Sequence, residues 1–200
     1  MILAYDVTDR TAHVAWQGND GVTHLREVSD GKATGFLLPL LQDVEQQSGE
    51  TITSLGVVTG PGSFTGIRVG LATALGLRAA RPMPVFGFTK PDLVAGLLEN
   101  QSLLLPAGRG QALCIAFHKG SAAGEPQILP HDQLGPAENY RAITPITGFD
   151  CELLQINTAE RCLQLIQAGA QEGRHPPEPY YVRPADAIAG RSLIDKLLNL

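Results

Sequence analysis

The chain has 200 residues, of which 44% are hydrophobic and 18% are charged, and its formal net charge at pH 7 is −5. This composition allows a sizeable core and excludes a disordered chain or a coiled coil. The negative charge argues against a protein that binds nucleic acid or anionic membranes over its whole surface, although a local basic patch is allowed.

The cysteines and the apolar runs indicate the cellular compartment of the protein. The three cysteines form no CxxC pair, so neither a disulfide framework nor a zinc site is expected. The longest apolar run is far shorter than the roughly 20 residues of a membrane span, and the N-terminus lacks the basic region of a secretory signal. We therefore expect a cytoplasmic protein with no membrane contact.

Residues 1–100 predict an ordered α/β unit. Strands are expected at 2–7, 11–17 and 23–28, and the last two flank Gly18-Asn19-Asp20-Gly21, a strong hairpin signal, so the three strands are expected to be antiparallel. An apolar helix at 34–47, a strand at 55–59, a helix at 66–81, a strand at 85–88 and a helix at 91–100 follow. This order predicts a mixed sheet with helices on its faces.

Residues 101–200 resemble a reduced copy of the first unit. Short strands are expected at 103–105, 112–117, 127–129, 142–147 and 153–156, and loops at 120–130 and 173–179. A helix is expected at 158–172, with Thr158 as its N-cap.

The most informative segment lies between Glu50 and Asp92. It contains no acidic residue and four basic ones, and at its centre stands Gly60-Pro61-Gly62-Ser63-Phe64-Thr65-Gly66-Ile67-Arg68-Val69-Gly70, between an expected strand and an expected helix. The glycines fit neither the Walker loop nor the GxGxxG dinucleotide fingerprint. A glycine turn before a helix still suits an anion, with Ser63 or Thr65 as helix cap. The alternative is a tight turn with no ligand.

The helix at 66–81 is unusual because small and apolar residues surround it. Each interior glycine, such as Gly66 or Gly70, costs roughly 1 kcal/mol relative to alanine, and close approach of another backbone can offset that cost. A helix that is apolar nearly all round is buried on more than one side. We interpret the second side as contact with another subunit's helix, with a central core helix as the alternative.

The segment 60–70 resembles the signature of the bacterial TsaB (YeaZ) family, accessory subunits for making threonylcarbamoyladenosine on tRNA. Other stretches resemble the same family: Ile2-Leu3-Ala4-Tyr5-Asp6, Leu38-Pro39, Phe86-Gly87-Phe88-Thr89 and, near the end, Pro179-Tyr180-Tyr181-Val182-Arg183. The resemblance is strong over residues 1–100, thin through the middle, and returns at 179–186.

The resemblance implies an α/β fold of the actin-like (ASKHA, ribonuclease H-like) class, with lobes at 1–100 and 101–200, the second reduced. It implies a non-catalytic subunit, inactive alone, that activates the catalytic relative TsaD together with the ATPase TsaE and meets tRNA only through that complex. A homodimer is expected for the isolated chain. The interface is expected on helices 34–47 and 66–81, at Leu37, Leu41, Phe64, Ile67, Arg68, Gly70, Leu71, Ala74 and Leu75.

No metal and no resident cofactor are expected, apart from weak or partner-dependent ATP binding. A degenerate nucleotide or anion site is placed at Asp6, Thr8, Gly60, Gly62, Ser63 and Thr65. For Arg68 the sequence leaves three contacts open: a partner, a nucleotide or an internal acid.

The chain also departs from the family pattern. Ala33 stands where relatives carry a histidine, and residues 106–113 differ from the relatives' Asp-Ala-Arg-x-Gly-Glu-Val-Tyr. The replaced positions there are Pro106, Gly108, Gln111 and Leu113. Roles that relatives assign to these positions are not expected here, and the second lobe is expected to be largely structural.

Two other functions compete with the accessory role. A free-standing actin-fold ATPase or small-molecule kinase would use Asp6 at the end of the first strand, although no glycine follows within residues 7–11 to admit a phosphate. A zinc glycoprotease would need bound metal, yet no two histidines stand four residues apart, and no GxSxG elbow is present.

Overall fold

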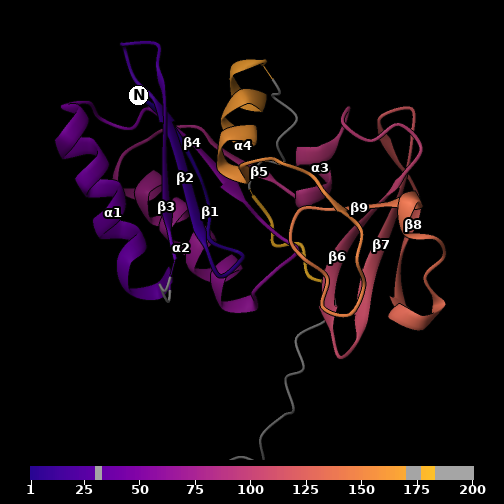
Figure 1. The fold of residues 1–200 in the computed structure, drawn as a ribbon. Helices are drawn as coiled ribbons and strands as arrows, with labels where there is room; N and C mark the ends of the chain where they lie inside the picture. Colours follow the sequence, from indigo (N-terminus) through magenta and orange to yellow (C-terminus); the bar gives the residue numbers. More distant parts are fainter. Residues whose placement is uncertain (30–32, 170–176, 183–200) are drawn as a thin grey trace, which may run out of the picture.

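The computed structural model describes residues 1–29, 33–169 and 177–182. Two five-stranded sheets stand beside each other, with helices packed on the first of them (Figure 1). No helix of the described residues is long and apolar enough to cross a bilayer.

The first sheet has the strand order β3-β2-β1-β4-β5. Its strands are β1 (Ile2–Asp6), β2 (Ala12–Gln17), β3 (Thr23–Val28), β4 (Ser54–Val58) and β5 (Val85–Phe88). The first three form the predicted antiparallel meander, and β4 and β5 add parallel to it. The mixed sheet follows from the connections, because a short hairpin reverses the chain whereas a helical crossover restores its direction.

Helices cover both faces of this sheet. On one face, α1 (Ala33–Ser48) and α2 (Phe64–Ala80) pack against each other and against the strands, with Leu37, Leu41 and Ile67 in the core between them. On the other face lies α4 (Thr158–Gln167), whose Cys162 and Leu163 are fully buried. Thus a helix from the second half of the chain completes the core of the first sheet.

The second sheet has the order β10-β9-β6-β7-β8. Its strands are β6 (Ser102–Gly108), β7 (Gln111–His118), β8 (Ser121–Pro130), β9 (Tyr140–Ala142) and β10 (Glu152–Leu153), with one-turn helices at His131–Gln133 and Ala137–Asn139. The expected loop at 120–130 is wrong, because Lys119 and Gly120 turn the chain directly from β7 into β8. The strands expected at 142–147 and 153–156 are shorter and begin earlier.

Two helices also differ from the sequence prediction. α3 (Lys90–Val94) is much shorter than the expected 91–100, since Thr89 and Asp92 cap its start and Gly96, at φ +78°, follows its end. α4 is capped by Asn157, whose side chain accepts from two backbone N–H groups, and not by Thr158. It ends at Gln167, before a turn through Gly169 at φ +78°, whereas the expected end at residue 172 lies outside the described residues.

Candidate functional site

The glycine loop between β4 and α2 packs against the chain's own β1–β2 turn. A Cβ on Gly62 would lie 2.5 Å from the carbonyl oxygen of Thr8, and one on Gly66 would overlap the carbonyl oxygen of Val7. Gly70 likewise faces the Val7 side chain. The close approach that these glycines permit is therefore internal, which corrects the expectation that another subunit's helix fills it.

Several backbone donors of this loop are already used. The Ser63 N–H donates to Thr8 O at 2.6 Å, and the Ser63 hydroxyl accepts from Gly66 N at 3.2 Å, so Ser63 is the helix cap. The Gly60 carbonyl oxygen accepts from the Lys90 N–H at 2.7 Å, which joins the loop to the start of α3 but uses none of the loop's own donors. Backbone donors that would hold a phosphate are thus partly consumed by the fold itself.

Asp6 lies at the end of β1, beside this loop, as the parallel pairing of β1 and β4 requires. One carboxylate oxygen of Asp6 accepts from the Thr8 N–H at 2.8 Å and from the Thr8 hydroxyl at 2.7 Å. The other oxygen is buried with no hydrogen-bond partner in the described part of the chain. Asp6 therefore holds the turn that follows it.

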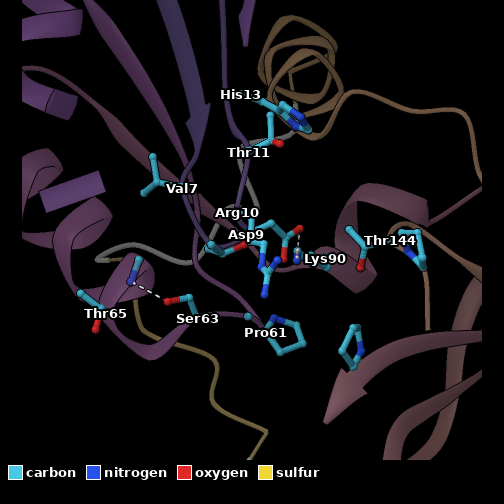
Figure 2. Close-up of a pocket in the computed structure, with 15 residues that line it drawn as sticks. Val7, Asp9, Arg10, Thr11, His13, Pro61, Ser63, Thr65, Lys90 and Thr144 are labelled. Carbon is cyan, nitrogen blue, oxygen red and sulfur yellow. Dashed lines mark hydrogen bonds and ion pairs between the residues drawn. The ribbon is translucent and has the colours of Figure 1, made fainter. Parts of the chain in front are cut away.

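A cavity of about 1040 Å³ separates this region from the second sheet (Figure 2). Its walls are the β1–β2 turn, the glycine loop, Lys90 of α3 and, from the other side, Pro106, Thr144 and Pro145. Thr8, Gly62, Ser63 and Thr65 of the predicted anion site line it, whereas Asp6 and Gly60 are not among its lining residues. The predicted residues are therefore neighbours, and only some of them face open space.

Sequence reasoning missed a buried ion pair in this wall. The Lys90 ammonium lies 2.7 Å from Asp9 Oδ2 with its side chain only 1% exposed, and Figure 2 shows the two side chains joined. Burial raises the pKa of Asp9, and the attraction of Lys90 opposes that rise. Nothing in the sequence links residues 9 and 90, because only the strand order brings them together.

The predicted interface residues on α1 and α2 fall into two groups. Inward-facing side chains belong to the core: Leu37, Leu41, Ile67, Leu71 and Ala74 are between 0% and 8% exposed, and Gly70 is also buried. Buried side chains offer no surface to a partner, so the structure does not support a direct contact through them. Phe64, Arg68 and Leu75 are exposed, and so is Leu38, which the sequence prediction omitted.

Six of the exposed residues of α2 form a stripe that we call the outer face of α2. It consists of Phe64, Arg68, Ala72, Leu75, Gly76 and Ala79. Gly76 stands out because a Cβ there would meet nothing within 4 Å, so no contact within the described residues requires glycine at this position. Phe64 and Leu75 are 37% and 43% exposed.

The positions that depart from the family pattern lie in the β6–β7 hairpin. Leu113 is 3% exposed and packs in the core of the second sheet, and Pro106 lines the cavity. Gly108 has φ +73° and lies at the turn that pairs it with Gln111. These residues build the hairpin, whereas the side chain of Ala33 and residue 183 lie outside the described part.

The remaining polar groups do not converge on a metal site. In the described ranges, no three His, Cys, Asp or Glu side chains form a group that could hold a metal ion. The His13 ring contacts the Thr158 hydroxyl at 3.1 Å. Burial raises the pKa of the Cys162 thiol well above its usual value.

This geometry defines a class: an α/β protein of two mixed sheets with flanking helices, in which the glycine loop packs against the chain's own β1–β2 turn. The chain matches no protein-family model. TsaB of Escherichia coli, named a tRNA threonylcarbamoyladenosine biosynthesis protein, is 36% identical over 91 residues, which are 43% of this chain and 38% of that relative. TsaB of Haemophilus influenzae, of the same name, is 33% identical over 87 residues, which cover 42% and 37%. The match thus spans less than two fifths of either relative.

Two solved structures share the fold over most of its length. YeaZ from Pseudomonas aeruginosa has a TM-score of 0.67 at 20% identity, covering 90% of this chain and 99% of that one. A Pseudomonas aeruginosa protein described as similar to the peptidase YEAZ has a TM-score of 0.68 at 21% identity, covering 91% and 99%. The predicted fold class is confirmed. The sequence identity to the two TsaB proteins extends over less than half of this chain, and the likeness to the two solved structures shows a shared fold.

Proposed function

We propose that this chain is an accessory subunit in the formation of threonylcarbamoyladenosine on tRNA. In this role it is not itself the catalyst, and it binds the catalytic relative TsaD, with the ATPase TsaE acting in the same complex. The proposal rests on the likeness to TsaB, which extends over less than half of the chain.

The observation that carries the proposal is the outer face of α2. Its exposed Phe64 and Leu75 alternate with small residues, and α2 contains no acidic residue. An interior helix glycine costs roughly 1 kcal/mol, and for Gly76 nothing within the described chain offsets this cost. A partner helix that approaches closely would offset it, and covering the exposed apolar side chains would add to the association.

The surroundings of Asp6 support a non-catalytic role. Thr8 occupies one oxygen of Asp6, and the glycines that could cradle a phosphate pack instead against Val7 and Thr8. Two backbone donors of this loop, the N–H groups of Ser63 and Gly66, are therefore already bonded within the chain. The chain's contribution then lies in its surface and not in bond making.

The test uses a pair of matched substitutions. Leu75 and Leu97 are both 43% exposed, but Leu75 lies on the outer face of α2 and Leu97 follows α3. Leu75→Glu should abolish co-purification with TsaD and lower threonylcarbamoyladenosine formation in the reconstituted complex about tenfold or more, because a charge enters an apolar contact. Leu97→Glu should leave both unchanged.

Normal association and tRNA modification with Leu75→Glu would contradict the proposal. Leu71→Glu and Gly70→Arg would instead probe folding, since both positions are buried.

The cavity favours a second candidate, a free-standing actin-fold ATPase or small-molecule kinase. Its walls include Thr8, Asp9 and Ser63, and Asp6 keeps one unpartnered oxygen close by. This function predicts ATP turnover by the isolated chain that Asp6→Ala abolishes. The accessory role predicts no turnover above that of Asp6→Ala, and ATP binding that is weak or needs the partner.

A further inference from the structure

Arg68 is an exposed cation in an unusual setting on the outer face of α2. Its guanidinium carbon lies 3.8 Å from the centre of the Phe64 ring, one helical turn earlier on α2. A cation over an aromatic face is attracted to it, and here the ring also restricts where the guanidinium can lie. Arg68 is therefore held in place before any partner arrives.

A second aromatic ring braces this stack. Tyr181 contacts Phe64 with ring centroids 5.0 Å apart. Tyr181 belongs to Pro177–Val182, a segment we call the strap, in which Tyr180 N donates to Thr59 O at 2.9 Å at the end of β4. Tyr180 and Val182 pack with the core of the second sheet, whereas Tyr181 packs with that of the first. The strap thus anchors the Phe64 ring to both halves of the molecule.

The structure narrows what Arg68 can contact. No carboxylate of the described residues forms an ion pair with it, and it is not among the residues that line the cavity. An internal acid within the described chain and a ligand in that cavity are therefore both disfavoured. A carboxylate from outside the described residues remains.

A second copy of this chain is a poor source of that carboxylate. The only acids on α1 are Asp43, paired with Arg26 at 2.6 Å, and Glu45, paired with Arg81 at 2.8 Å, and α2 has none. Two copies that met through these helices would bring Arg68 against acids that already have partners. A different chain with a free acidic residue complements the face better.

We propose that Arg68, stacked on Phe64 and braced by Tyr181, is the charge-recognition element of the outer face of α2 and pairs with a carboxylate on a helix of a different protein. The inference rests on the proposed function, since it describes how that partner is recognised. A nucleic acid is a poorer fit, because phosphate binding draws on several cations and this face presents Arg68 among apolar residues.

The first experiment measures the dissociation constant for TsaD by titration calorimetry at several salt concentrations. Arg68→Met, which keeps the alkyl length, should weaken binding about tenfold or more, equivalent to about 1.4 kcal/mol, and should flatten its salt dependence. Arg78→Met is the matched control, because Arg78 is an exposed arginine of the same helix that stacks on no aromatic ring of the described residues. It should change the constant less than twofold.

If the wild type binds TsaD, and Arg68→Met and Arg78→Met change the dissociation constant equally, the inference is overturned and the proposed function stands. Absence of binding by the wild type would overturn both. If the isolated chain binds free tRNA and Arg68→Met abolishes that binding, Arg68 contacts a phosphate and the inference is overturned.

The second experiment tests the brace. Tyr181→Ala should weaken binding several-fold and reduce its salt dependence. Adding Arg68→Met should cause little further loss of affinity, because both substitutions act on the same positioned guanidinium. Tyr181→Phe keeps the ring and should bind as the wild type does. Additive losses in the double variant, or failure of Tyr181→Phe to retain affinity while its circular dichroism is normal, would overturn the role of Tyr181.

Discussion

Gly66 and Gly76 lie on the same helix and serve different purposes. A Cβ on Gly66 would overlap the backbone of Val7, whereas one on Gly76 would meet open space. We expect Gly66→Ala to lower the free energy of unfolding by about 2 kcal/mol, because the neighbouring backbone must move. Gly76→Ala should raise it by about 1 kcal/mol through helix propensity alone. Urea unfolding measures both.

The same pair separates stability from association. If a partner helix closes on Gly76, Gly76→Ala should weaken TsaD binding even though it stabilises the isolated chain. A variant that gains stability and keeps full affinity would show that the partner does not approach at this residue. If Gly66→Ala and Gly76→Ala destabilise the chain equally, the close contact between Gly66 and the backbone of Val7 does not set the cost at Gly66.

At the scale of single elements, the ion pair between Asp9 and Lys90 fastens the β1–β2 turn to the start of α3. Lys90 is almost completely buried, and Asp9 is its counter-ion at 2.7 Å. Asp9→Ala should cost about 3 kcal/mol of unfolding free energy, since it leaves a buried ammonium without a counter-ion. The double variant Asp9→Ala/Lys90→Met should recover most of that loss in denaturant unfolding. No recovery would mean that the turn, and not the buried charge, carries the cost.

Elements with a strong local pattern are the ones that could be predicted. The β2–β3 hairpin has its glycine turn, and α1, α2, β4 and β5 lie within two residues of their expected bounds. The end of α3 could not be predicted, because the apolar residues continue to Leu98 after the helix has ended. Val94 and Leu98 pack against the second sheet, so tertiary contacts and not helix periodicity account for the apolar residues in this segment.

At the scale of the whole molecule, the two halves of the sequence do not pack separately. α4 covers the face of the first sheet formed by Ala4, Ala15 and Val58 (Figure 1). Leu163→Asp should therefore destabilise the chain by about 3 kcal/mol or more and speed amide hydrogen exchange in β1 and β4. Gln164→Asp, at the neighbouring exposed position, is the control and should leave exchange in those strands unchanged. Unchanged exchange with Leu163→Asp would contradict this coupling.

The sequence by itself determined the mixed sheet, the two apolar helices and the place of the glycine loop, because each follows from local periodicity and turn chemistry. It also grouped Asp6, Thr8 and Ser63 in one predicted anion site. Only the tertiary structure decided what the glycines approach, which face of α2 is free, and that Arg68 lies on Phe64. Those answers depend on contacts between residues far apart in the chain, such as Tyr181 with Phe64 and Lys90 with Asp9, for which local sequence carries no signal.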